Sequence, residues 1–103
     1  MITQLTSKAP NQCTSLDDAR HEIDAIDLHI IRLLAHRHEY VKMVARFKEA
    51  TLSAIQADDR RQQVLECRRQ WAKEQGLDPD VIAQMWDMMI AYFIREELKI
   101  KKI

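Results

Sequence analysis

Residues 15–50 read SLDDARHEIDAIDLHIIRLLAHRHEYVKMVARFKEA, and this stretch decides the fold. It contains neither glycine nor proline. Its apolar side chains recur at intervals of three, four and seven residues, at Leu16, Ala19, Ile23, Ile26, Ile30, Leu33, Leu34, Val41, Val44 and Ala45. Such intervals are typical of an amphipathic helix. Because Ser15 followed by Asp18 resembles a capping box, we predict one helix from about Leu16 to Ala50.

The predicted helix is too long for a small chain to cover by itself. At ~1.5 Å per residue it runs for roughly 50 Å, whereas a compact chain of about 100 residues has a radius of gyration near ~13 Å. Part of the apolar stripe must therefore be buried by something outside the chain. We predict that a second copy of the chain covers it.

The composition indicates one packed, mostly helical domain. The chain has 103 residues, of which 47% are hydrophobic, with a single glycine and two prolines. Its 16 basic and 16 acidic residues give a formal net charge of zero, which argues against a nucleic-acid-binding protein. No run of about 18 apolar residues occurs, so we predict no membrane partner.

The N-terminal residues differ in character from the rest. Residues 1–12, MITQLTSKAPNQ, lack the apolar core of a signal peptide. We predict that they form a flexible tail, that residues 13–103 form the helical domain, and that the protein is cytoplasmic. Cys13 and Cys67 lie far apart, with no Cys-x-x-Cys pair, so we expect two reduced thiols.

The remainder of the chain predicts two shorter helices. The segment Thr51 to Ala57 has a weak helical pattern and is expected to be a loop or loosened turn. Asp58 or Asp59 can then cap a helix from about Asp59 to Glu74, which Gly76 ends. Asp78 and Pro79 begin a third helix that reaches about Lys99. The predicted fold class is all-α, with one long and two shorter helices.

Three cations on the long helix suggest an anion site. Arg37 and Lys48 are eleven residues apart, so on a straight helix they point the same way, about 16 Å apart. Their long side chains could straddle one small anion. Arg20 lies seventeen residues before Arg37, roughly 25 Å away and rotated by roughly 100°. It could therefore serve only the site of a partner chain.

Two further charges fall on apolar faces. Arg60 leads a stripe with Val64 and Trp71, and Glu97 ends a stripe with Ile90 and Phe93. Singly, each such charge is more often part of a surface ion pair than of a binding site. Together, the cations and the carboxylate describe a site for a compact dianion.

Other kinds of site find little support in the sequence. The four histidines, at positions 21, 29, 36 and 38, have no metal-binding spacing. The chain also has no glycine-rich phosphate loop and no nucleophile motif. These patterns favour neither a metal nor a phosphate-bearing cofactor.

Several motifs resemble the all-helical chorismate mutase family, chorismate mutase type II. The pattern L-x-x-x-R-x-x-I-D-x-I-D-x-x-I spans Leu16 to Ile30, and it is followed by R-x-x-Y-V from Arg37, F-K at Lys48, D-R at Arg60 and G-L-D at Gly76. A leading C-T-x-L-x-D-x-R from Cys13 and an A-I-x-A-x-[DE]-R run from Ala54 are similar to the isochorismate-pyruvate lyase branch, which makes salicylate for siderophores. The resemblance covers nearly the whole chain beyond residue 12.

The resemblance implies an intertwined homodimeric helical bundle without metal or cofactor. Each of its two sites takes Arg20 from the neighbouring chain. Arg20, Arg37 and Arg60 would bind the carboxylates of the substrate, and Lys48 would hydrogen-bond the ether oxygen whose C–O bond breaks. Glu97 stands where the lyases of this branch and many mutases have glutamine, as the second donor to that oxygen. An ionised carboxylate only accepts hydrogen bonds, so Glu97 must carry a proton to act there.

Two positions near Arg60 bear on the branch. Dedicated mutases often have carboxylates at the positions of Ala57 and Arg61, where they hold the ring hydroxyl of the substrate. Ala57 favours the lyase branch, whereas Arg61 matches neither pattern.

Three hypotheses for the function follow. The first is an isochorismate-pyruvate lyase with chorismate mutase activity. The second is a dedicated chorismate mutase of aromatic amino acid synthesis, which uses the same site. The third is a non-catalytic helical dimerisation module, which explains the long apolar stripe but not the cations aligned with it.

Overall fold

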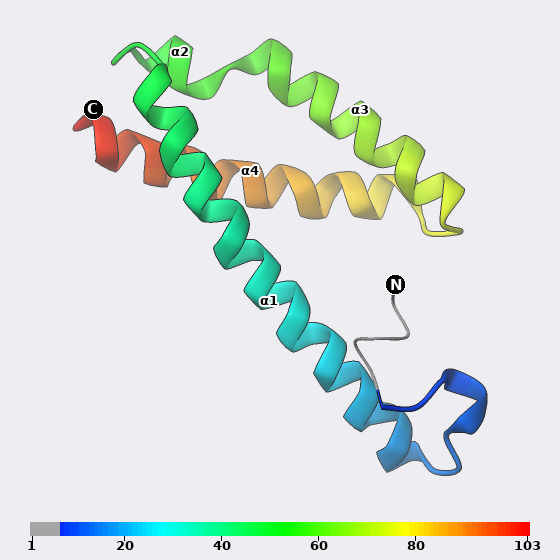
Figure 1. Ribbon diagram of the computed structural model, residues 1–103. Helices are drawn as coiled ribbons and strands as arrows, with labels where there is room; N and C mark the ends of the chain where they lie inside the picture. The colour runs from blue at the N-terminus through cyan, green and yellow to red at the C-terminus, as the bar shows by residue number, and fades with distance from the viewer. Residues whose placement is uncertain (1–6) are drawn as a thin grey trace. The chain divides into compact units, whose positions relative to one another are not determined.

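The chain is all helical, as predicted. The structure is a computed structural model that describes residues 7–103, and no strand occurs in that range (Figure 1). The elements are a 3-10 turn η2 (Pro10–Gln12) and the helices α1 (Leu16–Phe47), α2 (Leu52–Gln56), α3 (Asp58–Glu74) and α4 (Pro79–Lys101). The chain divides into two compact units, Met1–Glu39 and Tyr40–Ile103, and α1 contributes residues to both. No helix within residues 7–103 is long and apolar enough to cross a membrane.

The predicted start of α1 is confirmed. The Ser15 hydroxyl accepts a hydrogen bond from the main-chain N–H of Asp18 at 3.0 Å, which satisfies one of the free donors of the first turn. In a complete capping box the Asp18 side chain would accept from the N–H of Ser15, but here it accepts from the residue before Ser15. The Asp18 carboxylate accepts from the N–H and the hydroxyl of Thr14, at 3.1 and 3.0 Å. This cap fixes the direction in which the chain enters α1.

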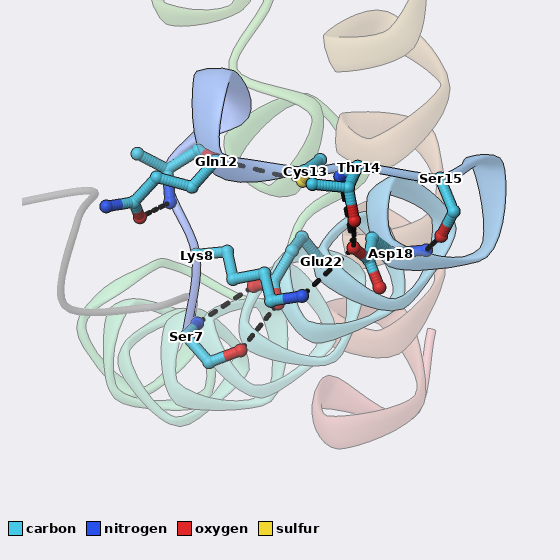
Figure 2. Close-up of polar contacts among 9 residues, drawn as sticks. Ser7, Lys8, Gln12, Cys13, Thr14, Ser15, Asp18 and Glu22 are labelled. Carbon is cyan, nitrogen blue, oxygen red and sulfur yellow. Dashed lines mark hydrogen bonds and ion pairs between the residues drawn. The ribbon is translucent and has the colours of Figure 1, made fainter.

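A segment before α1 folds back onto its first turns (Figure 2). Ser7 donates from its N–H and its hydroxyl to the two carboxylate oxygens of Glu22, at 2.8 and 2.6 Å. Lys8 forms an ion pair with Asp18 at 2.9 Å. The sequence did not predict these contacts for residues 7–12. The predicted flexible tail also includes residues 1–6, which lie outside the described residues, and its flexibility stays a prediction.

These contacts shift the pKa of the groups that make them. The hydrogen bond from Lys8, followed by those from Thr14, lowers the pKa of Asp18 from 3.8 to about 2. The hydrogen bond from the Ser7 hydroxyl lowers the pKa of Glu22, against the opposing effect of burial. The Lys8 pKa is raised by the same bond to Asp18.

The segment after α1 differs from the prediction. We expected α1 to reach Ala50 and residues 51–57 to be a loop, but α1 ends at Phe47 and residues 52–56 form the short helix α2. The Thr51 hydroxyl caps α2 by accepting from the N–H of Ala54 at 3.2 Å. The Ile55 side chain is fully buried. Burial of that side chain compensates for the weak helical propensity of the segment.

The predicted cap of α3 is wrong, whereas its predicted end at Gly76 is confirmed. Neither Asp58 nor Asp59 is the N-cap, because α3 already begins at Asp58, after Ala57 in the left-handed conformation (φ +46°). At the other end Gly76 has φ +75°, a conformation that favours glycine, and the N–H of Leu77 donates to Ala72 at 2.8 Å. The connection from α3 to α4 is therefore a short turn at Gly76.

The start of α4 follows the prediction closely. One carboxylate oxygen of Asp78 accepts from the N–H groups of Asp80 and Val81, at 2.9 and 3.2 Å. Pro79 is the first helical residue, where its missing N–H costs no hydrogen bond. The helix runs two residues beyond the predicted end, to Lys101.

The second unit has a packed core. Helices α3 and α4 pack against each other, and α2 contacts α4 (Figure 1). The buried apolar side chains come from all four helices and are Ala45, Ile55, Val64, Leu65, Ala72, Ala83 and Phe93. Lys48, predicted to lie within the long helix, follows directly after its end at Phe47, and Glu97 lies in α4. The core holds both segments in place.

Candidate active site

Lys48 and Glu97 meet in the second unit although 49 residues separate them. The Lys48 ammonium lies 3.2 and 3.3 Å from the two carboxylate oxygens of Glu97, and it donates to the main-chain carbonyl of Ile55 at 3.0 Å. Glu97 is only 4% exposed, so the prediction that it lies on a buried stripe is confirmed. The two groups expected to act on one ether oxygen are thus in contact with each other.

The end of α2 helps to place Lys48. The last carbonyl groups of a helix have no intrahelical donor, and a lysine ammonium can satisfy one of them. Here the Ile55 carbonyl takes that role, while the buried Ile55 side chain fixes α2. An ammonium has three N–H donors. The Ile55 carbonyl and the two carboxylate oxygens of Glu97 accept three hydrogen bonds from it, which together fix its position.

Arg60 is in the same unit but not in the same cluster. It is the third residue of α3 and its side chain is exposed. In the part of the chain that the structure describes, the Arg60 side chain makes no hydrogen bond and no ion pair. The structure therefore places Arg60 on a surface rather than against Lys48 or Glu97.

Arg20 and Arg37 belong to the first unit. Arg20 is exposed in the first turns of α1, and Arg37 is partly buried further along the same helix. Of the five predicted site residues, Lys48 and Glu97 are the two that the structure brings into contact.

Sequence reasoning left Arg61 without a role, and the structure supplies one. Its Nε atom lies 2.7 Å from a carboxylate oxygen of Asp87, and its Nη2 atom donates to the main-chain carbonyl of the same residue at 3.4 Å. The pair joins α3 to α4. A signal was present in the sequence, because Arg61 precedes the buried Val64 and Leu65 by three and four residues and so shares their face.

The structure gives no support for a metal site within its described range. No group of three or more histidine, cysteine, aspartate or glutamate side chains in residues 7–103 could hold a metal ion. Cys13 and Cys67 are both free thiols. The expectation that the protein needs no cofactor stays a prediction.

Comparisons with known proteins agree with the resemblance. Residues 19–98 match the model of the family described as chorismate mutase type II. Over 92 residues the chain is 41% identical to the isochorismate pyruvate lyase of Pseudomonas aeruginosa, which covers 89% of this chain and 90% of that protein. It is also 34% identical over 82 residues to the T-protein of Haemophilus influenzae, which covers 80% of this chain but only 21% of that protein.

Proposed function

Because the chain belongs to the chorismate mutase type II family, we propose that it is an isochorismate-pyruvate lyase that also has chorismate mutase activity. The observation that carries the proposal is the similarity to the Pseudomonas aeruginosa lyase, which extends over most of both chains. Since the family is one of enzymes, the hypothesis of a non-catalytic dimerisation module loses its support.

Both reactions are pericyclic and use the same starting geometry. In the lyase reaction the C–O bond to the enolpyruvyl side chain breaks while a ring hydrogen moves to that side chain, which gives salicylate and pyruvate. In the mutase reaction the same kind of C–O bond breaks while a carbon–carbon bond forms, which gives prephenate. Neither reaction needs a nucleophile or a general base. The enzyme holds the side chain over the ring and stabilises charge that develops on the ether oxygen.

The proposed roles follow from the chemistry of each group. Lys48 donates to the ether oxygen, and Glu97, when protonated, donates to the same atom. The 3.2 Å distance between the two side chains supports placing both at the same substrate atom. Arg20, Arg37 and Arg60 bind the two carboxylates of the substrate, because a guanidinium matches the geometry of a carboxylate.

The proposal includes a homodimer with shared sites. The described part of the first unit leaves several large apolar side chains of α1 about half exposed or more, namely Leu16, Ile23, Leu28, Ile30, Ile31 and Leu33. A stripe of that kind on one long helix supports burial by a second copy. Arg20 lies among these residues and would then reach the site of the partner subunit. The cytoplasmic location predicted from the sequence also belongs to the proposal.

A dedicated chorismate mutase is the second candidate. The observation that favours it is the family model itself. Glu97 does not separate the two candidates, because many mutases as well as the lyases have glutamine at that position. Ala57 favours the lyase, because it offers no carboxylate for the ring hydroxyl of the substrate.

The deciding experiment offers both substrates to the purified protein. We expect isochorismate to give equal amounts of salicylate and pyruvate, and chorismate to give prephenate at a lower kcat/KM. Prephenate alone would replace the lyase by the dedicated mutase. If neither product formed from a folded protein, the proposed enzymatic activity would be wrong.

A further inference from the structure

The first turn of α3 lacks the side-chain cap that fixes many helix starts. Its N-cap is Ala57, whose side chain accepts no hydrogen bond. Asp58 and Asp59 are exposed and make no side-chain hydrogen bond or ion pair within residues 7–103. The start of α4, in contrast, is held by Asp78 through two hydrogen bonds. The turn that carries Arg60 therefore needs another anchor.

Arg61 provides that anchor. Its main-chain N–H makes the first helical bond of α3, to the Ala57 carbonyl at 2.9 Å. Its guanidinium contacts both the carboxylate and the main-chain carbonyl of Asp87, with the shorter distance at 2.7 Å. A planar guanidinium that binds two acceptors of one residue fixes orientation as well as distance. The pair thus ties the first turn of α3 to the middle of α4.

Arg60 depends on this turn for its own direction. Adjacent residues on a helix diverge by about 100°, so Arg60 and Arg61 do not face the same partner. Arg60 is exposed, and within the described residues its side chain makes no hydrogen bond or ion pair that could orient it. Its direction is set by the backbone of the first turn, which Arg61 holds.

We propose that Arg61 is a positioning residue, which through its ion pair with Asp87 holds the first turn of α3 so that Arg60 points toward the substrate. The inference rests on the proposed function, in which Arg60 binds a substrate carboxylate. Arg61 itself does not contact the substrate.

A purely electrostatic role predicts a different outcome, so the two can be separated. Removal of Arg61 leaves the Asp87 carboxylate unpaired and would repel a dianion, whereas removal of Asp87 leaves a free cation and would attract it. In the electrostatic case the two substitutions change KM in opposite directions. If Arg61 is a positioning residue, both substitutions free the first turn of α3, and both raise KM.

The experiment measures kcat and KM with isochorismate, or with chorismate if only that is turned over. We expect Arg61→Ala and Asp87→Ala each to raise KM by roughly three- to tenfold, the range that ordering one flexible side chain contributes to affinity. We expect kcat to stay within about twofold, because Arg60 binds the substrate carboxylate in the ground state and the transition state alike. The double variant should be no worse than the poorer single variant.

A second ion pair between the same helices supplies the matched control. Arg69 lies 3.5 Å from Asp80 and also joins α3 to α4, but it is nine residues beyond Arg60. Arg69→Ala should leave KM unchanged, whereas a general loosening of the α3–α4 contact would raise it in the same way. Arg60→Ala is the reference, and its KM should exceed that of Arg61→Ala.

Each outcome decides the inference. If Arg60→Ala raises KM but Arg61→Ala and Asp87→Ala do not, Arg61 has no positioning role and the role of Arg60 stands. If Arg60→Ala leaves KM unchanged, the proposed role of Arg60 is wrong and the inference falls with it. A lower KM in Asp87→Ala assigns the pair an electrostatic role. If Arg61→Ala does not fold, Arg61→Lys replaces it in the test. Lysine keeps the charge but lacks the planar guanidinium that binds two acceptors, so this variant should also raise KM.

Discussion

The two units of the chain differ in what they bury. Across the described residues, every fully buried apolar side chain lies in the second unit, with Ile55 as the largest. In the first unit the buried side chain is the carboxylate of Glu22, and Ile23 beside it is 54% exposed. A cavity of about 300 Å³ lies between the N-terminal segment and α1, lined mainly by apolar groups. Within the described residues the second unit thus buries an apolar core of its own, although it also exposes large apolar side chains such as Phe47 and Met88, whereas the first unit buries no apolar side chain.

The proposed site residues follow this division. Lys48 and Glu97 are held by contacts inside the packed unit, whereas Arg20 is exposed on the unit with the uncovered stripe. The difference teaches that Lys48 and Glu97, the groups proposed to stabilise charge, are placed by contacts within one chain. Placement of the Arg20 guanidinium is the task that we assign to a second copy.

Loss of Lys48 should have the largest effect. We expect Lys48→Ala to lower kcat about 10²–10³-fold, because the contact strengthens as charge develops on the ether oxygen. Arg20→Ala and Arg37→Ala should also raise KM, since these groups bind the ground state. Steady-state kinetics with both substrates measures the split. A Lys48→Ala enzyme with nearly normal kcat would remove Lys48 from the mechanism.

Mixing two inactive variants tests whether the first unit acts on a partner. Arg20→Ala chains mixed with Lys48→Ala chains should regain about a quarter of the normal activity, because half of the dimers are mixed and each has one intact site. Sedimentation should give about twice the 12.2 kDa chain mass for each variant. Chains that exchange subunits without regaining activity would show that Arg20 does not act in trans.

Isoleucine truncations compare the two units by stability. Ile55→Ala should lower the free energy of unfolding by about 2–5 kcal/mol, the usual range for a buried isoleucine. Leu52→Ala, at a half-exposed position of the same helix, is the matched control and should cost far less. Ile23→Ala should be costly only if a partner covers that side chain, and its effect should then shrink as the protein is diluted and the dimer dissociates.

Those stabilities are measured by denaturant titration at several protein concentrations. If Ile23→Ala behaves like Leu52→Ala at every concentration, no second copy covers the first turns of α1.

A conservative change at Glu97 tests the state of its proton. Activity should fall with rising pH if Glu97 must be protonated to donate to the ether oxygen. Glu97→Gln carries a permanent donor of similar shape, so its rate should be flat between about pH 5 and pH 8 and equal or higher at the upper end. The measurement is kcat against pH for both proteins. A native profile without slope over that range would show that Glu97 is not this donor.

The smallest predicted effect is a change in the pKa of Asp18, which the N-terminal segment contacts through Lys8. Because the folded pKa of Asp18 is about 2 and its ordinary value is 3.8, the stability from its contacts is fully present above about pH 4 and is lost as pH falls through about 2. Lys8→Ala should move the Asp18 pKa back toward 3.8, while the Thr14 bonds retain part of the shift. An NMR titration of the Asp18 carboxyl carbon measures it.

Lys99→Ala is the control for that titration. It removes a similar ion pair, with Glu96 at 2.8 Å, near the other end of the chain. It should leave the Asp18 titration unchanged. An equal shift in both variants would assign the effect to net charge rather than to the Lys8 contact.

Local signals were sufficient to predict most helix ends. Ser15, Gly76 and Asp78 act through hydrogen bonds to residues within four positions, or through their own backbone angles, so their effect can be read from neighbouring sequence. The helix α2 was not predicted, because its stability comes from burial of the Ile55 side chain against other helices. The misplaced cap of α3 has the same origin, since Ala57 both ends α2 and precedes α3.

The sequence by itself determined the all-α class, the long amphipathic helix and the family, because these depend on residue spacing and on motifs along the chain. Only the tertiary structure decided which distant groups meet. Lys48 reaches Glu97 across 49 residues, Arg61 reaches Asp87 across 26, and Ser7 reaches Glu22 across 15. The physical reason is that an ion pair or hydrogen bond requires its two atoms to lie within about 3 Å, and the packing of helices, rather than the spacing of residues, sets that distance.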